Sequence, residues 1–282
     1  MTRVARLWPD LGFSTPQIMA VLNVTPDSFS DGGLLYGDHV PLQTVIDHAA
    51  SRIDAGATLL DIGGESTRPG ALPVSVDTEL ERVIPVIDAL AARFDVVLSI
   101  DTSTPQVMLE AARRGARLIN DVRALTREGA LEAAYATGLP VCLMHMQGSP
   151  QTMQNNPVYQ DPVDEVLDWL MTRVEVCINQ GFDRQQLLLD PGFGFGKTLA
   201  HNVALFRNLR RFLETGLPVM VGVSRKSMLG EITGRPIEQR VTASATAAAI
   251  AAQSGAAIVR VHDVAETRDA MMVMQTLMQG SQ

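Results

Sequence analysis

The chain has 282 residues, of which 46% are hydrophobic and 19% charged, and its formal net charge is −8. This composition is typical of a folded globular protein and excludes an intrinsically disordered chain. The acidic excess argues against nucleic acid or anionic lipid as a partner, and no apolar run reaches the ~18 residues of a membrane span.

Residues 1–17 are interrupted by charged side chains and by Pro9, and they lack the apolar core of a signal peptide. Cys142 and Cys177 lie far apart in the sequence, without the spacing of metal ligands. Such cysteine usage is typical of a reducing compartment, so we expect a cytoplasmic protein.

Eight short apolar runs recur along the chain, each followed by a polar or glycine-rich stretch and then by a helical pattern. Most of these runs show no apolar–polar alternation, as is typical of parallel strands buried on both faces. The predicted strands are, in chain order, 18–22, 58–62, 96–100, 118–119, 141–144, 187–189, 219–223 and 258–261.

Amphipathic stretches between these runs predict helices, and two of the helix starts carry an N-cap residue followed by proline, at Thr104-Pro105 and Asp161-Pro162. The clearest predicted helices are 78–93, 163–180, 203–214 and 238–253.

Eight βα units in a row, without a break in composition, predict an α/β fold in which residues 1–282 form a single (β/α)8 TIM barrel domain. A doubly wound open sheet is the alternative. We favour the barrel because the units number eight and no dinucleotide-binding glycine loop follows the first strand. Reactive groups of such barrels lie on the loops at the carboxyl ends of the strands.

Four of the predicted strands end in a carboxylate or a carboxamide, at Asp61, Asp101, Asn120 and Asp190. A single aspartate in this place is most often a turn former or a helix N-cap. Helix capping does not explain four such groups, because all of them would converge on the barrel axis. We therefore predict a polar site there.

Two other aspartates have simpler interpretations. Asp263 has capping-box spacing with Glu266 and is predicted to cap the last helix. Asp121 directly follows Asn120, so the alternation of side chains along a strand predicts that it faces away from the axial site.

Basic side chains follow the last two strands. Lys226 stands between hydroxyls at Ser224 and Ser227, and Arg260 and His262 alternate along the eighth strand. Exposed lysine and arginine side chains are usually just solvated. Barrels often hold phosphate near strands seven and eight, however, so we predict an anionic and phosphorylated ligand.

The glycine-rich stretch 191–197 is not a nucleotide-binding loop, because Pro191 and Lys197 stand where the known fingerprints need glycine. The five histidines show no paired spacing for zinc. His145 follows the fifth strand, and both a ligand-facing and a structural hydrogen-bonding role stay open for it.

Several motifs together make the chain resemble the bacterial dihydropteroate synthase family, over about residues 18–277. Each motif alone is weaker than the set. They are NVTPDSFSDGG at 23–33, DIGGESTRPG at 61–70, LLDPGFGFGK at 188–197, and SRKS at 224–227 with RVH at 260–262.

The resemblance implies a TIM barrel, usually a homodimer, that acts as a transferase in folate biosynthesis. Its reaction joins 6-hydroxymethyl-7,8-dihydropterin diphosphate to p-aminobenzoate, with Mg²⁺ assisting, to form 7,8-dihydropteroate and diphosphate. Sulfonamides compete for the p-aminobenzoate position.

The resemblance also implies roles by motif position. The pterin would be held by Asp101, Asn120, Met144, Asp190 and Lys226. Diphosphate would be bound by Asn23, Thr67, Arg260 and His262, with Asn23 also holding Mg²⁺. The p-aminobenzoate site would be shaped by Phe29, Thr67, Arg68, Pro69, Phe195 and Ser227, with Asp31 on the first loop, whose closure would complete it. Catalysis would depend on Asp101, Lys226, Arg260 and Asn23.

These residue types suit the chemistry. One carboxylate, expected at Asp190, accepts hydrogen bonds from the pterin N3–H and 2-amino groups together, while Asn120 both donates and accepts. We hypothesise a dissociative path in which Asp101 stabilises a pterin cation, while Mg²⁺, Arg260 and His262 stabilise the leaving group.

Two rivals remain at this stage. A pterin-binding methyltransferase barrel would share the carboxylates but would not need the anion-binding motifs after strands seven and eight or the 67–69 loop. A non-catalytic paralogue would have lost reactive residues, yet Asn23, Asp101 and Lys226 are all present.

Overall fold

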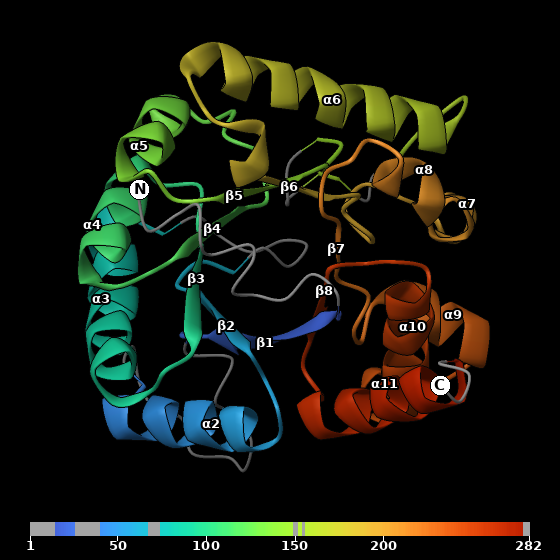
Figure 1. Ribbon diagram of the computed structural model, residues 1–282, viewed down its shortest axis with the longest axis horizontal. Helices are drawn as coiled ribbons and strands as arrows, with labels where there is room; N and C mark the ends of the chain where they lie inside the picture. Colours follow the sequence, from blue (N-terminus) through green and yellow to red (C-terminus); the bar gives the residue numbers. More distant parts are fainter. Residues whose placement is uncertain (1–14, 26–39, 67–73, 149–151, 154–155, 279–282) are drawn as a thin grey trace.

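The computed structural model describes residues 15–25, 40–66, 74–148, 152–153 and 156–278. Within these residues eight parallel strands form one sheet, and helices surround it (Figure 1). The strands are β1 (Gln17–Asn23), β2 (Leu59–Gly63), β3 (Val97–Asp101), β4 (Leu118–Asp121), β5 (Val141–Met144), β6 (Leu187–Asp190), β7 (Met220–Val221) and β8 (Ile258–Val261).

The sheet order is β6-β5-β4-β3-β2-β1-β8-β7, so β1 lies between β2 and the last strand of the chain. An isolated bridge between Leu189 and Val219 joins β6 to β7 and brings the sheet to a nearly closed barrel. The predicted TIM barrel is confirmed, and the doubly wound alternative is wrong.

All eight predicted strands are present, and the differences lie at their ends. Polar residues extend four of them, since β1 includes Gln17 and Asn23, β3 includes Asp101, β4 includes Asn120 and Asp121, and β6 includes Asp190. The seventh strand is shorter than the predicted 219–223, because the chain leaves the sheet at Gly222.

The helices alternate with the strands and cover the outside of the barrel (Figure 1). They are α2 (Leu42–Asp54), α3 (Val76–Arg93), α4 (Pro105–Arg114), α5 (Ala130–Thr137), α6 (Pro162–Gln180), α7 (Leu199–Arg207), α8 (Leu209–Leu213), α9 (Ser227–Thr233), α10 (Val241–Gln253) and α11 (Val264–Met278), with 3₁₀ turns η3 (Arg184–Gln186) and η4 (Ile237–Gln239). Among the described residues, no helix is both long enough and apolar enough to cross a membrane.

Two helix predictions need correction. The predicted helix 203–214 is divided into α7 and α8 at Asn208, whose side-chain Nδ2 donates to the Ala204 carbonyl over 2.8 Å. The predicted helix 238–253 begins only at Val241, because the residues before it form the η4 turn.

The N-cap predictions have mixed outcomes. Asp161 caps α6, since its Oδ1 accepts hydrogen bonds from Val163 N and Asp164 N. Thr104 stands at the N-cap of α4 but makes no capping hydrogen bond. Asp263 directly precedes α11, and its carboxylate oxygens pair with Arg225, so the predicted capping role of this side chain is wrong.

A small apolar cluster fills the barrel interior below the site. Its members come from seven of the strands and are fully or almost fully buried: Met19, Leu59, Leu118, Cys142, Leu188, Met220, Ala257 and Ile258. Side chains two residues further along a strand face the same side. That step leads from apolar residues to Asp61, Asn120, Asp190 and Arg260, so the barrel interior turns polar toward the carboxyl ends of the strands.

Candidate active site

A cavity opens above the apolar cluster at the carboxyl ends of the strands. It brings together side chains from β1, β3, β4, β5, β6 and β8 and from the loops after β6 and β7. The lining residues are Val21, Asp101, Asn120, Val122, Met144, Asp190, Gly192, Phe193, Phe195, Gly222, Ser224, Lys226, Arg260 and His262.

A buried ion cluster lies at this cavity. Arg260 Nε lies 2.6 Å from Asp61 Oδ2, and Arg260 Nη2 lies 2.7 Å from Asp101 Oδ2. Ser99 Oγ donates to the other Asp61 oxygen over 2.6 Å. Asp61 is fully buried and is not among the cavity-lining residues. Both of its carboxylate oxygens accept hydrogen bonds from protein donors, so its role is to orient Arg260.

Asn120 presents an unpaired acceptor to the cavity. Its Nδ2 donates to Asp61 Oδ2 over 2.9 Å, and because a carboxylate only accepts, this contact fixes which way the amide points. Its Oδ1 is buried and has no hydrogen-bond partner among the described residues. An unsatisfied buried acceptor is costly, and a ligand donor would remove that cost.

Asp190 also keeps an oxygen for a ligand. Gly192 N donates to Asp190 Oδ1 over 2.7 Å, and within the described chain no donor reaches Oδ2. Gly192 has a φ of +69°, and a Cβ there would lie 1.8 Å from the His145 carbonyl oxygen. Only glycine therefore permits the tight turn that aims the Asp190 carboxylate.

Lys226 lines the cavity together with Asp190. Its Nζ lies 4.0 Å from the centroid of the Phe195 ring, a cation–π distance, and no carboxylate of the described residues forms a salt bridge with it. Burial, followed by Arg260, lowers the pKa of Lys226 to about 8. The ammonium is thus a poorly compensated donor beside an aromatic ring.

Burial also acts on the acids. It raises the pKa of Asp190 to about 6, against the opposing effects of the Gly192 hydrogen bond and of Lys226. It raises the pKa of Asp101 as well, where Arg260 opposes it and Asp61 adds to it. Perturbed titratable groups gathered in one cavity are typical of functional sites.

The cationic character expected after strands seven and eight is weaker than the residue types indicate. Burial, with help from Arg260, lowers the pKa of His262 to about 3, so its imidazole is neutral. Its Nδ1 lies 3.1 Å from Ser224 Oγ. Arg225 is bound to Asp263 instead of facing the cavity. Lys226 and the partly neutralised Arg260 are therefore the cations that reach the cavity in the described chain.

Lys197 and His145 form a support behind the β6 loop, in which the role of Lys197 was not predicted from the sequence. Lys197 Nζ lies 2.9 Å from His145 Nδ1, 2.9 Å from the Gly192 carbonyl and 3.0 Å from the Phe195 carbonyl. His145 packs edge-on against Trp169. Neither residue lines the cavity, so the structural alternative for His145 fits this geometry better.

Most of the predicted site residues lie together. The cavity is lined by Asp101, Asn120, Met144, Asp190, Phe195, Lys226, Arg260 and His262. Asn23 and Ser227 are not among its lining residues. Phe29, Asp31, Thr67, Arg68 and Pro69 lie outside the described residues.

Asn23 nevertheless stands next to the site. It ends β1 opposite Gly63, and a Cβ on that glycine would lie 3.3 Å from Asn23 Oδ1 and 3.7 Å from Asp101 Oδ2. The two oxygens thus flank the same glycine. Among the described residues, no three His, Cys, Asp or Glu side chains are arranged to hold a metal ion.

Comparison with known proteins agrees with this geometry. The family described as pterin binding enzyme matches residues 19–262. The dihydropteroate synthase of Escherichia coli (strain K12) is 52% identical over 272 residues, which cover 96% of this chain and 95% of the relative.

Two solved structures have the same fold. The Yersinia pestis dihydropteroate synthase with a sulfonamide drug complex has a TM-score of 0.89 at 54% identity, covering 94% of this chain and 95% of that one. The Xanthomonas albilineans dihydropteroate synthase in complex with 7,8-dihydropteroate has a TM-score of 0.86 at 46% identity, covering 95% and 96%.

Proposed function

The chain belongs to the dihydropteroate synthase family of pterin-binding enzymes, and we infer from this that it catalyses the family's condensation. The substrates are 6-hydroxymethyl-7,8-dihydropterin diphosphate and p-aminobenzoate, and the products are 7,8-dihydropteroate and diphosphate. One observation carries the proposal: the cavity gathers unpaired donors and acceptors that match the edge of a pterin.

The unpaired groups assign an orientation to the bicyclic ring. Asp190 Oδ2 accepts from the pterin N3–H and 2-amino edge, and Asn120 Oδ1 accepts from a further pterin N–H. Lys226 donates to O4 or N5. Met144, 3% exposed, packs against the ring face. A ligand without this edge leaves several buried polar groups unsatisfied, which provides selectivity.

The reaction breaks the C–O bond between the exocyclic methylene of the pterin and the diphosphate. The bonding electrons leave with diphosphate, and positive charge spreads over the methylene and the ring. Asp101 stabilises that charge, while the free N–H groups of Arg260 and the neutral His262 donate to the departing oxygens. The amine of p-aminobenzoate then forms the new C–N bond and loses one proton.

Magnesium fits the proposed site as a substrate-bound ion. Mg²⁺ prefers oxygen ligands and is often held by one or two protein groups plus substrate phosphates and water. Asn23 offers a carboxamide oxygen beside Asp101, and the described residues provide no complete cage of their own. When bound, the ion neutralises charge on the leaving diphosphate.

The p-aminobenzoate site is proposed at the edge of the cavity. Phe195 lines that cavity, and Ser227 is the first residue of α9, directly after Lys226. With them we group Phe29, Thr67, Arg68 and Pro69 from the family motifs. Positioning the weakly basic aniline nitrogen and excluding water from the cation are the tasks of these residues.

A direct assay tests the proposed function. The purified chain is incubated with radiolabelled p-aminobenzoate, dihydropterin diphosphate and Mg²⁺, and dihydropteroate and diphosphate are measured together. Equal formation of the two products, with sulfonamides competing against p-aminobenzoate, supports the synthase. Diphosphate release without incorporation of label would indicate a hydrolase, and binding without turnover would indicate a non-catalytic paralogue.

We also propose that residues 1–282 form one domain, that the chain is a cytoplasmic homodimer, and that its ligands are small molecules. The free thiols of Cys142 and Cys177 support a reducing compartment.

An apolar groove between α7, α9 and α10 supports the dimer, because Ile232 and Ile250 are 58% and 46% exposed there. Light scattering on the wild type and on Ile250→Glu tests this, and a monomeric wild type would contradict it.

A further inference from the structure

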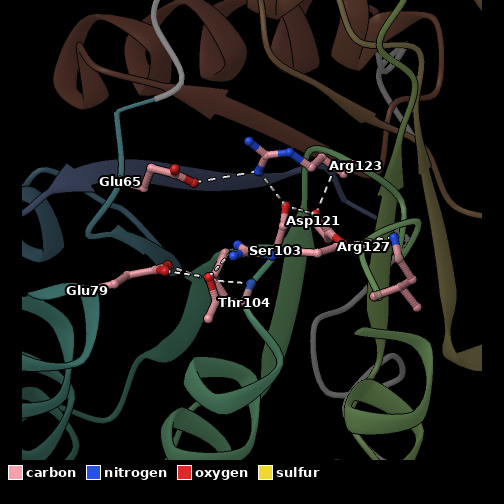
Figure 2. Close-up of polar contacts among 9 residues, drawn as sticks. Glu65, Glu79, Ser103, Thr104, Asp121, Arg123 and Arg127 are labelled. Atoms are coloured by element: carbon pink, nitrogen blue, oxygen red, sulfur yellow. Dashed lines mark hydrogen bonds and ion pairs between the residues drawn. The ribbon is translucent and has the colours of Figure 1, made fainter. Parts of the chain in front are cut away.

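Three consecutive hydroxyl side chains follow Asp101 at the end of β3. They are Thr102, Ser103 and Thr104, and each is at most 4% exposed. Figure 2 shows that their hydrogen bonds run to opposite sides: Thr104 is bonded toward Glu79 on α3, and Ser103 toward Asp121 at the end of β4. The three hydroxyl residues, Glu79 and Asp121 are not among the residues that line the cavity.

Glu79 holds the two threonines. Thr102 Oγ1 donates to Glu79 Oε1 over 2.5 Å, and Thr104 Oγ1 donates to Glu79 Oε2 over 2.6 Å. Arg127 Nη1 in turn donates to Thr104 Oγ1 over 2.9 Å. Glu79 is 2% exposed, so a charged helix residue has been buried to bind two hydroxyls. Burial raises the pKa of its carboxyl, and these two hydrogen bonds oppose that effect.

Asp121 holds the serine between them. Its Oδ1 accepts from Ser103 Oγ and, over 2.9 Å, from Arg123 N, while Oδ2 accepts from Leu125 N over 2.8 Å. Arg123 Nη1 donates to Ser103 Oγ over 2.9 Å and lies 3.6 Å from Glu65 Oε2 (Figure 2).

We call the three hydroxyl residues and their hydrogen-bond and ion-pair partners the hydroxyl network. Its members are Glu65, Glu79, Thr102, Ser103, Thr104, Asp121, Arg123 and Arg127.

The backbone carries the network's effect to Asp101. Thr102 N donates to the Asn120 carbonyl over 3.1 Å, and its side chain is held by Glu79, so the residue next to Asp101 is fixed at both ends. The Asp101 carboxylate itself has one hydrogen-bond partner among the described residues, Arg260 Nη2. Because the Asp101 carboxylate has few contacts of its own, its orientation depends on the position of the backbone at Thr102.

We propose that Glu79 and Asp121 are positioning residues, which hold Thr102 and Ser103 so that the Asp101 carboxylate meets the reacting methylene of the pterin. The inference rests on the proposed role of Asp101 in turnover. It assigns two buried carboxylates outside the cavity to the chemistry inside it. A helix cap is a different use of Thr104, and α4 lacks that cap because the hydroxyl is bound to Glu79.

A double-mutant cycle tests the proposal. Thr102→Val removes the hydroxyl at nearly constant shape and is expected to lower kcat about tenfold, since a small misplacement of a reacting group costs that order of rate. KM for both substrates stays within about twofold, because the ground-state contacts are unchanged. Thr102→Ser keeps the hydroxyl and restores kcat. On the Asp101→Asn background, Thr102→Val has no further effect on kcat.

Thr267→Val is the matched control. Thr267 is fully buried on α11 and donates to the Asp263 carbonyl over 2.7 Å, so its loss costs one buried hydroxyl contact elsewhere in the barrel. We expect it to lower the melting temperature and leave kcat unchanged. Glu79→Gln, which keeps the shape of the side chain, provides a second route and is expected to lower kcat with the same dependence on Asp101.

The outcomes separate the two proposals. If Asp101→Asn alone retains its kcat, the proposed role of Asp101 fails. If Asp101→Asn lowers kcat but Thr102→Val lowers it by the same factor on both backgrounds, the positioning inference is overturned while the function stands. A change in Thr102→Val confined to its melting temperature, as in the control, also overturns it.

Discussion

Two groups of buried polar side chains lie at the carboxyl ends of the strands, one lining the cavity and one in the hydroxyl network, and they use their hydrogen bonds differently. In the cavity, hydrogen-bond partners among the described residues are lacking for Asn120 Oδ1, Asp190 Oδ2 and Lys226 Nζ. In the hydroxyl network, both oxygens of Glu79 and of Asp121 are bound. Asn120 and Asp121 are adjacent in sequence, so strand alternation alone divides the two roles.

This difference in hydrogen-bond satisfaction indicates which of the two groups binds a ligand. Groups that are buried but unsatisfied destabilise the empty protein, and a ligand with the complementary edge recovers that free energy. Groups that are buried and satisfied have nothing left to offer a ligand and act on structure instead. Matched substitutions in the cavity and in the hydroxyl network should therefore have different effects.

The largest effect is expected for Asp190→Asn. The amide keeps the shape but places a donor or a neutral oxygen where the pterin needs a charged acceptor, so kcat/KM for dihydropterin diphosphate falls about 100- to 1,000-fold. Steady-state kinetics with p-aminobenzoate at saturation measure this. Asp121→Asn is the same change in the hydroxyl network. An equally large fall in kcat/KM for dihydropterin diphosphate in that variant would remove the distinction between the two groups.

Asp101→Asn comes next. The substitution removes the negative charge beside the developing cation and is expected to lower kcat about 100-fold, with KM for the pterin substrate changed by less than about threefold. Single-turnover rates and a pterin-binding titration separate the two quantities. Equal losses in both would show that Asp101 only binds the ring.

The pH dependence sharpens the comparison through Asp190 and Lys226. The pKa of Asp190 is raised to about 6, so below that pH its carboxyl is protonated and no longer accepts two hydrogen bonds. The pKa of Lys226 is lowered to about 8, so above that pH its amine is neutral.

We therefore expect kcat/KM for the pterin substrate to be bell-shaped, falling about tenfold per pH unit on the alkaline side. The acidic side falls more steeply, because the pKa of Asp101 is also raised, to about 7, and both carboxylates are needed in their charged form. The profile of Asp190→Asn should keep the alkaline limb and have a shallower acidic limb, because Asp101 then titrates there alone. An unchanged acidic limb would assign that titration to another group.

The smallest effects are on stability, and they differ between the cavity and the hydroxyl network. Glu79→Ala leaves the buried hydroxyls of Thr102 and Thr104 without their acceptor and is expected to cost about 1–3 kcal/mol of unfolding free energy. Asp190→Asn removes a carboxyl whose burial is unfavourable and is expected to leave the melting temperature unchanged or raised. Differential scanning calorimetry without ligands checks both, and equal destabilisation would contradict the contrast.

The strands could be predicted from the sequence because parallel strands buried on both faces are short apolar runs. The exceptions have local causes. The seventh run was predicted too long because apolar character continues through Val223 after the chain has left the sheet. The helix 203–214 was predicted unbroken because Asn208 interrupts it without a glycine or a proline.

The site was predictable where position along a strand decides it. Asn120 and Asp190 end buried strands, and period-2 alternation places Asp121 on the other face. Pairing across the barrel was not predictable, because the contact of Arg260 with Asp61 depends on β2 and β8 flanking β1. The neutral state of His262 depends on its burial, which residue type does not reveal.

Lys197 was missed for a related reason. A lysine at the end of a glycine-rich loop is usually exposed, yet this one is 3% exposed and binds the carbonyls of Gly192 and Phe195. Burial lowers its pKa to about 7. No local pattern marks such a residue, since its partners become neighbours only when the β6 loop folds back.

The weak join between β6 and β7 gives the bound pterin a mechanical role. Apart from the Leu189–Val219 bridge and the hydrogen bond from Leu189 N to the Pro218 carbonyl, no backbone hydrogen bond between described residues links these strands. Asp190 stands at one edge of this seam and Lys226 follows the other. A pterin that is hydrogen-bonded to both Asp190 and Lys226 would link β6 to the loop after β7. Amide hydrogen exchange in 219–223 should therefore slow on pterin binding more than exchange in β2.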